Sequence, residues 1–203
     1  MPDISYIVSA YSWMEQLPTC LYSLKAQTHG DFEVIVTDNS TKENLARRCR
    51  SIVTSMRDKR FRYLHTAGKI RVSDPYWSSE YGIKHSSGRW LCFPTDDAYY
   101  PPEWAQRMLV AAYRGNLDLV LCERLIAGPD GCGAEGYFPV DCAESGIPGY
   151  KPSFLVRRSK FAGWLNKPMV VACSGVDRTT LEHLIKQKDV RSGFCRGLYY
   201  VHN

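Results

Sequence analysis

Short apolar runs alternate with helical patterns along the first two-thirds of this chain, and this alternation constrains the fold more than any other feature. Strand-like and helix-like segments that follow one another favour a largely parallel sheet with helices on both faces. The sequence therefore predicts an α/β fold with a mostly parallel central sheet, in the manner of a Rossmann-like sandwich. The expected strands are 4–10, 32–38, 61–65, 90–93, 117–123 and 197–201, and the expected helices are 15–27, 42–56, 77–86, 102–114 and 177–188.

The length of 203 residues and the hydrophobic share of 44% are enough for one sizeable core. We therefore expect a single domain over residues 1–203, divided into a regular half (1–124) and a second half (125–203). The second half opens with a glycine-rich stretch at 127–152 that lacks sustained periodicity, and so long a loop is usually functional. Within it, residues 131–136 match the dinucleotide fingerprint in form only, because Pro-containing segments replace the strand and helix that the fingerprint needs.

Charge and cysteine content exclude several classes of protein. The formal net charge of +5 comes from dispersed Lys and Arg residues without a nucleic-acid recognition motif, so we expect no nucleic-acid partner. The eight cysteines include no Cys-x-x-Cys pair, and those inside apolar runs are expected to be free thiols. The start of the chain has no secretory pattern. No stretch of the sequence is apolar over a length that would span a membrane. Together these features predict a cytoplasmic protein.

Two adjacent carboxylates, Asp96 and Asp97, follow the apolar run at 90–93. In an open α/β sheet, ligands bind beyond the carboxyl ends of the strands, which is where this pair is expected. Hard cations such as Mg²⁺ and Mn²⁺ take one or two carboxylates together with substrate phosphates. A metal site is therefore one interpretation, and a turn that caps the following helix is the other.

Three segments together resemble family 2 glycosyltransferases. They are the first strand with its end at Val8-Ser9-Ala10-Tyr11, the run from Leu21 to Ser40, and the run from Tyr81 to Trp90 ahead of the acidic pair. The resemblance covers roughly residues 4 to 110. It implies a GT-A fold, a nucleotide-diphosphate sugar donor, a divalent Mn²⁺ or Mg²⁺ cofactor and inversion at the anomeric carbon.

The resemblance also implies roles for individual residues. Ala10 and Tyr11 would touch the nucleoside, and Asp38 would bind the base. Asp96 would face the ribose and the water molecules bound to the metal, and Asp97 would ligate the metal ion directly. From the residues alone, Tyr11 is equally a packing residue, and Asp38 is equally a cap for the next helix.

The chain departs from the family pattern at Ser78-Ser79-Glu80, where the family commonly has Ala-Arg-Asn and thus an arginine near the pyrophosphate. Lys69 and Arg71 are the nearest candidates to replace that charge, and we expect Arg71 to do so because a guanidinium binds phosphate oxygens bidentately. A solvated surface arginine is the alternative.

Glycosyl transfer also needs a base to take the proton of the acceptor hydroxyl. By resemblance this base is Asp177, although the partner acid of the family is missing and a helix N-terminal charge is the alternative. His202, near the chain end, resembles a metal-ligating histidine of some GT-A enzymes, and imidazole suits Mn²⁺ better than Mg²⁺. The alternative for His202 is a solvated side chain.

The sequence thus predicts a metal-dependent glycosyltransferase that uses a nucleotide sugar, with UDP as the expected carrier, and in which 1–124 binds the donor and 125–203 meets the acceptor. Two alternatives are a catalytically weak nucleotide-sugar-binding module and a sugar-1-phosphate nucleotidyltransferase. The latter would need a glycine-rich basic segment after the first strand, where Ser12-Trp13-Met14-Glu15 stands instead. Neither the sugar nor the acceptor follows from the sequence.

Overall fold

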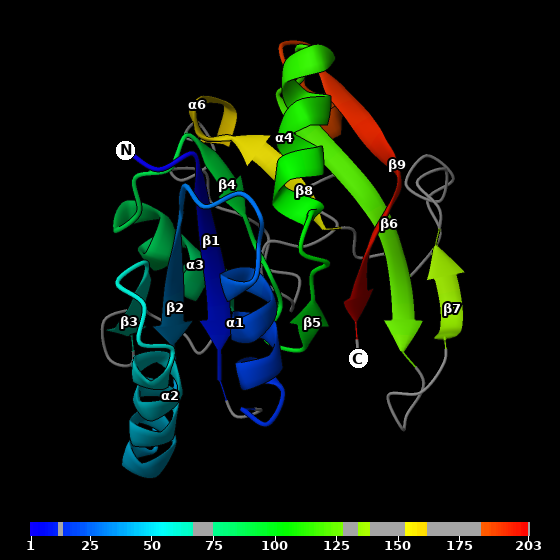
Figure 1. Cartoon of the computed structure of the whole chain (residues 1–203). Helices are drawn as coiled ribbons and strands as arrows, with labels where there is room; N and C mark the ends of the chain where they lie inside the picture. Colours follow the sequence, from blue (N-terminus) through cyan, green and yellow to red (C-terminus); the bar gives the residue numbers. More distant parts are fainter. Residues whose placement is uncertain (12–13, 67–74, 128–133, 139–152, 162–183, 203) are drawn as a thin grey trace.

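The computed structural model describes residues 1–11, 14–66, 75–127, 134–138, 153–161 and 184–202. In this part of the chain, nine strands form one sheet in the order β3-β2-β1-β4-β8-β6-β9-β5, and β7 pairs with β6 outside that path (Figure 1). The strands are β1 (Ile4–Ala10), β2 (Phe32–Asp38), β3 (Phe61–His65), β4 (Trp90–Cys92), β5 (Ala98–Tyr99), β6 (Leu119–Ala127), β7 (Ala134–Phe138), β8 (Phe154–Arg157) and β9 (Ser192–His202).

The sheet is parallel in its first half and mixed in its second. Strands β1 to β4 are mutually parallel, as the alternating pattern predicts. Beyond them, β8 runs antiparallel to both β4 and β6, while β9 is parallel to β6 and antiparallel to β5. The expected α/β sheet flanked by helices is confirmed, and its mixed second half is the part that alternation did not predict.

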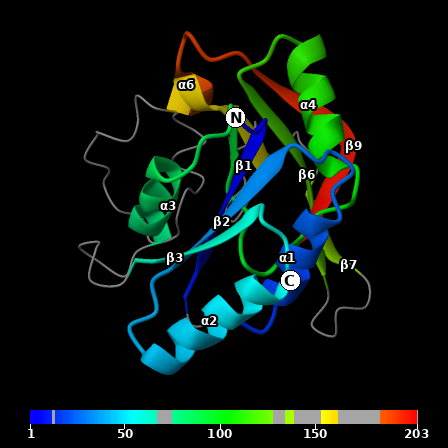
Figure 2. The same cartoon turned by 60° about the vertical axis from the view of Figure 1, so that its left-hand side comes forward.

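Helices cover both faces of the sheet (Figures 1 and 2). One face carries α1, α2 and α4, whose apolar residues join one core cluster. The other face carries α3 and α6, whose residues Ile83 and Phe161 belong to a second cluster. The helices are α1 (Leu17–Lys25), α2 (Glu43–Ser55), α3 (Pro75–Lys84), α4 (Trp104–Arg114) and α6 (Arg158–Phe161).

Helix α4 shows how the sequence pattern produces this layering. Trp104, Met108 and Ala112 recur at helical spacing and are fully buried against the sheet. The Trp104 ring packs at a centroid distance of 5.0 Å from Tyr100, and its indole N–H donates to the Sγ atom of Cys122 at 3.2 Å. The helix that follows the acidic pair is therefore fixed firmly on the core.

The described cysteines are buried free thiols, in agreement with the expectation from their apolar surroundings. Burial raises the pKa of the Cys122 thiol to about 12, so this thiol stays protonated and packs as a small apolar group. None of the described helices is long and apolar enough to cross a membrane.

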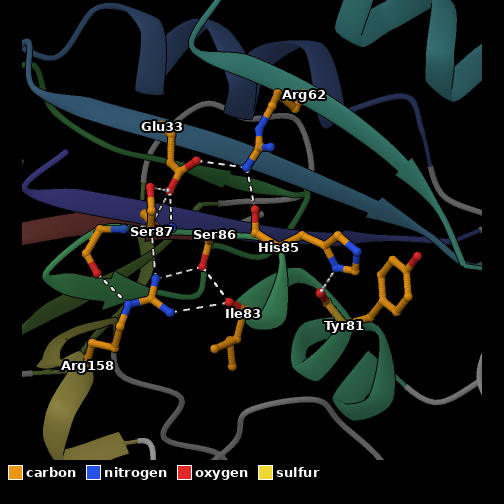
Figure 3. Close-up of polar contacts among 10 residues, drawn as sticks. Glu33, Arg62, Tyr81, Ile83, His85, Ser86, Ser87 and Arg158 are labelled. Atoms are coloured by element: carbon orange, nitrogen blue, oxygen red, sulfur yellow. Dashed lines mark hydrogen bonds and ion pairs between the residues drawn. The ribbon is translucent and has the colours of Figure 1, made fainter. Parts of the chain in front are cut away.

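A polar network ties the strands together at their amino ends (Figure 3). The Glu33 carboxylate, at the start of β2, accepts hydrogen bonds from Ser5 Oγ at 2.8 Å, Ser87 N at 2.6 Å and Arg62 Nη2 at 2.9 Å. Arg158 of α6 donates to the carbonyl oxygen of Gly88 and to Ser86 Oγ. These contacts link the amino ends of β1, β2 and β3 to the segment before β4 and to α6.

The second half of the chain differs from the sequence-based expectation in two places. Residues 134–138 form strand β7 inside the stretch expected to be irregular, and this strand lies where the dinucleotide fingerprint would need a helix, which confirms its rejection. The expected strand 197–201 is part of the longer β9. Of the expected helix 177–188, residues 177–183 lie outside the described part of the chain.

Candidate functional site

The carboxyl ends of β1, β2 and β3 lie level with one another. Ala10 pairs with Asp38, and Asp38 pairs with His65, so the last residues of the three strands form a row across the sheet. An isolated parallel bridge from Ser9 to Thr95 adds the segment after β4 to the same edge. Parallel strands end at one edge of a sheet, and here that edge holds three of the residues predicted for the donor site: Ala10, Tyr11 and Asp38.

The acidic pair forms a tight turn at this edge. Ala98 N donates to Thr95 O at 3.2 Å and closes the turn around Asp96 and Asp97, while the Cys20 thiol donates to the same carbonyl at 3.3 Å. The turn leads directly into β5, and the N-cap of α4 is Glu103, without a side-chain cap. Asp96 and Asp97 are thus not a cap for the following helix, which was the alternative interpretation.

The electrostatics of the turn suit a divalent cation. Burial, together with the negative charge of Asp97, raises the pKa of the Asp96 carboxyl to about 7. Two carboxylates held side by side in a half-buried turn repel each other, and a bound dication favours the ionised form of both. Carboxylate oxygens are also the ligands that Mg²⁺ and Mn²⁺ prefer. The residues present therefore fit the cofactor that the acidic pair predicts.

Asp38 is fully buried, and both of its carboxylate oxygens accept hydrogen bonds within the protein. Oδ1 accepts from Ser40 N at 2.8 Å, and Oδ2 accepts from the Tyr63 hydroxyl at 2.7 Å. The N-cap of α2 is Lys42, without a side-chain hydrogen bond, so Asp38 does not cap that helix. These two hydrogen bonds fix the orientation of the Asp38 carboxylate at the end of β2.

Loop contacts hold this edge in place. Ser40 Oγ donates to Tyr11 O at 3.0 Å, and His65 Nε2 donates to Ser40 O at 3.0 Å. The Tyr11 side chain is 44% exposed beside buried Ala10, so it offers a ring surface at the end of β1 and is not a core packing residue. The loops after three neighbouring strands are thereby bound to one another around Asp38.

The departure from the family pattern in α3 lies close to the same edge. Ser79 is buried, and its hydroxyl is 3.0 Å from that of Ser9, one residue before the end of β1. Glu80 is also buried and forms an ion pair with Lys84 at 2.5 Å. A small hydroxyl thus stands where the resemblance would place the side chain of an arginine.

The backbone places His202 near the acidic turn. In the antiparallel pairing of β5 with β9, His202 is opposite Ala98, the residue that directly follows Asp97. No group of three His, Cys, Asp or Glu side chains that could hold a metal occurs among the described residues. His202 stays a prediction as a ligand, supported by this register.

Two predicted site residues, Arg71 and Asp177, lie outside the described residues, as does Lys69. In contrast, Tyr63 belongs to the site although the sequence analysis did not single it out. Its hydroxyl binds Asp38, and burial followed by that carboxylate raises the pKa of the hydroxyl. The available signal was its position in the third expected strand, two residues before the strand end.

The family model described as "Glycosyl transferase family 2" matches residues 5–135, which is more than half of the chain and includes all of the strand ends described above.

Proteins of known sequence agree with this match. The chain is 29% identical over 122 residues to "Uncharacterized glycosyltransferase EpsJ" of Bacillus subtilis, covering 60% of this chain and 34% of that protein. It is 25% identical over 122 residues to "Glycosyltransferase AglE" of Haloferax volcanii, covering 59% and 38%. The chain therefore spans about a third of the length of these relatives.

Solved structures share the fold. S. aureus TarS 1-349 superposes with a TM-score of 0.72 at 18% identity, over 99% of this chain and 60% of that chain. The same protein in complex with UDP-GlcNAc gives 0.70 at 17% identity, over 98% and 58%. The mannosyltransferase PcManGT from Pyrobaculum calidifontis, in complex with GDP-Man and Mn²⁺, gives 0.68 at 15% identity, over 99% and 56%. The GT-A fold expected from the sequence is confirmed.

Proposed function

Because the chain belongs to glycosyl transferase family 2, we propose that it transfers a sugar from a nucleotide-diphosphate donor to an acceptor hydroxyl group, with inversion at the anomeric carbon. The observation that carries the proposal is the common edge on which Ala10, Asp38 and the turn of Asp96 and Asp97 meet. Such an edge offers a nucleoside wall and a metal-binding turn side by side.

The donor is held by its nucleoside. Asp38 is oriented by Ser40 N and the Tyr63 hydroxyl, and a carboxylate is an acceptor that suits the imide N–H of a uracil ring. The exposed ring of Tyr11 offers a surface beside the base. We therefore propose UDP as the carrier, a choice also supported by TarS, which was solved in complex with UDP-GlcNAc.

The diphosphate is held at the acidic turn. Asp97 and Asp96 would bind Mn²⁺ or Mg²⁺, with His202 as a further ligand and Arg71 as a cationic contact to the phosphates. When bound, the metal neutralises the negative charge that develops on the departing diphosphate. PcManGT, solved with GDP-Man and Mn²⁺, supports this assignment. Asp177 is proposed to take the proton of the acceptor hydroxyl as it attacks the anomeric carbon.

The test is calorimetric titration of the chain with UDP, GDP, ADP and CDP, with Mn²⁺, with Mg²⁺ and with chelator. We expect metal-dependent binding of one nucleotide, with UDP preferred. The Asp97→Ala variant should lose the metal-dependent component, and Asp97→Asn should lose most of it. Asp31→Ala removes an exposed carboxylate before β2, at the amino edge of the sheet, and serves as the control that should bind normally.

The outcomes separate the alternatives. UDP-sugars are incubated with a panel of acceptors. Release of UDP that requires an acceptor, and that the Asp177→Asn variant loses, supports the proposed glycosyl transfer. Tight donor binding without sugar release under any acceptor points to a nucleotide-sugar-binding module. If no nucleotide binds with either metal, or if Asp97→Ala binds as the unmodified chain does, the proposed donor site is wrong.

A further inference from the structure

A second site is indicated between α4 and the first part of β9, which together line an open hollow of about 430 Å³ on the surface. Three arginines from these two elements line it: Arg107, Arg114 and Arg196. The walls between them are apolar and come from Val110, Ala111 and Phe194. None of the described residues that line the hollow is acidic. A volume of this order is enough for a small ligand.

The arginines meet because of the helix period and an irregularity in β9. Arg107 and Arg114 are seven residues apart, two helical turns, so they lie on the same side of α4. Strand β9 contributes Arg196 from the point where its register with β6 shifts, next to Gly197, whose φ of 65° is a conformation that residues other than glycine rarely adopt. Helix and strand lie side by side in both views (Figures 1 and 2).

Arg107 is held in place by the main chain of this irregular segment. Its Nη1 donates to Gly197 O at 3.1 Å and its Nη2 donates to Arg196 O at 3.3 Å. Both bonds use one end of the guanidinium, which has five N–H donors in all. An arginine fixed in this way is preorganised, so less conformational entropy is lost when a ligand binds.

The roles that Arg107 and Arg114 have in the fold do not explain the hollow. Arg107 satisfies strand carbonyls, and Arg114 in the last turn of α4 interacts favourably with the helix dipole. Neither role requires three guanidinium groups around one hollow, where like charges repel each other. An anion between them would turn that repulsion into attraction.

We propose that this hollow binds the phosphate group of a phosphate-bearing ligand, with Arg107, Arg114 and Arg196 as donors and the apolar walls against the carbon part of the ligand. Three monocations match the double charge of a phosphate monoester better than the single charge of a carboxylate, and guanidinium forks bind phosphate oxygens bidentately. The site is separate from the strand ends of the proposed donor site, so the inference does not depend on the proposed function.

The experiment titrates the full chain with phenyl phosphate by calorimetry in the presence of chelator, which silences metal-dependent binding at the acidic turn. We expect one saturable site that binds benzoate at least tenfold more weakly. Arg114→Gln and Arg196→Gln should each weaken phenyl phosphate about tenfold, the order expected when one charge-assisted hydrogen bond is lost. Arg107 is left unchanged because it holds the backbone of β9.

Two controls keep the result specific. Arg48→Gln makes the same charge change on the exposed side of α2 and should bind within twofold of the unmodified chain. Asp97→Ala should also bind phenyl phosphate normally. Absence of saturable binding, equal binding by the double variant Arg114→Gln/Arg196→Gln, or an equal loss in Arg48→Gln would each overturn the proposal.

A second arm identifies the source of the phosphate. The chain is sedimented with vesicles of phosphatidic acid and phosphatidylcholine, and with vesicles of phosphatidylcholine alone, because phosphatidic acid carries a phosphate monoester. Binding only to the anionic vesicles, lost in the double variant, supports the site and assigns it to a lipid headgroup. Phenyl phosphate binding without vesicle binding supports the site and assigns it to a soluble phosphate ester.

Discussion

Replacing Glu33 by alanine tests whether the network at the amino edge of the sheet stabilises the fold. The carboxylate accepts from Ser5 Oγ, from Ser87 N and Oγ, and from Arg62 Nη2, and its side chain is only 13% exposed (Figure 3). Truncation removes the acceptor from all of these donors at once. The donors belong to β1, to the segment before β4 and to β3, so the network links β2 to both of its neighbours in the sheet and to the segment before β4.

The magnitude follows from the surroundings of each donor. Arg62 is 47% exposed and regains water, so its ion pair contributes little. Hydrogen bonds to a charged group are worth about 1.5–3 kcal/mol each and are not additive. Ser5 is fully buried and keeps Gly88 N as a donor to its oxygen, but its hydroxyl proton would lose its acceptor. We expect Glu33→Ala to lower the free energy of unfolding by about 3 kcal/mol.

The pH dependence has a definite sign. Burial opposes ionisation of Glu33, but the hydrogen bonds from Ser87 and Ser5 and the charge of Arg62 outweigh it and lower the pKa of the carboxyl. A carboxyl whose pKa is lower in the folded state stabilises the protein above the unfolded-state value of about 4.3, and this stabilisation disappears as the pH falls through the folded-state pKa. The stability gap between the unmodified chain and Glu33→Gln should therefore be constant above about pH 5 and shrink below about pH 4.

The assay is urea unfolding followed by circular dichroism at pH 7 and at several values between pH 3 and 5. Glu43→Gln is the matched control. The Glu43 side chain is 79% exposed, and its ion pair with Arg47 is long, at 3.8 Å, so it contributes little to stability. The control should change stability by less than about 0.5 kcal/mol at any pH. A loss below about 1 kcal/mol for Glu33→Ala, or a gap for Glu33→Gln that widens in acid, would refute the reasoning.

Two further predictions concern the packing that positions the site. Gly88→Ala would place a Cβ atom 2.5 Å from Ser5 N and 2.7 Å from Ile4 C. We expect this clash to lower the free energy of unfolding, measured in urea, by about 3 kcal/mol. In the control Gly30→Ala the new Cβ atom has nothing within 4 Å, so stability should change by less than about 1 kcal/mol. Gln27→Leu removes the donor to Pro101 O and the acceptor of Ala105 N on either side of the start of α4. It should cost about 2 kcal/mol and weaken Mn²⁺-dependent nucleotide binding in calorimetry; unchanged binding at a reduced stability would show that the acidic turn does not depend on this contact.

The first half of the fold was predictable because each element carries its own signal. Apolar runs such as Phe32–Asp38 and helical spacings such as Leu17, Leu21 and Leu24 need no knowledge of distant residues. The second half was not, because β8 inserts between β4 and β6, and β9 inserts between β6 and β5. Such an order depends on contacts between residues far apart in sequence, which periodicity does not record.

The candidate site divides in the same way. The acidic turn follows a strand with a clear apolar pattern, and its position at the carboxyl edge follows from parallel topology alone. The hydrogen bond from the Tyr63 hydroxyl to Asp38 could not be predicted from either residue, because it requires β2 and β3 to pair in the observed register. Side chains aligned by strand pairing are visible only once that register is known.

The position of His202 depends on the irregularity in β9. Cys122 pairs with Cys195, yet the next residue of β6, Glu123, pairs with Tyr199, so residues 196–198 are extra in β9. If 196–198 paired with β6 in regular register instead of bulging, His202 would lie three residues further along β6 and would no longer be opposite Ala98. The same three residues present the carbonyl groups that hold Arg107. Deleting 196–198 would join Cys195 directly to Tyr199 and keep the pairing of His202 with β6. We therefore expect this deletion to weaken phosphate binding, because Arg196 and the carbonyl groups that hold Arg107 are removed, and to retain metal-dependent nucleotide binding. Gly197→Ala, strained by the positive φ, should affect both in proportion to its effect on stability. Calorimetry of both ligands on both variants decides this: phosphate binding that the deletion retains would show that the bulge does not position that site, and nucleotide binding that a folded deletion variant loses would refute the argument from the register.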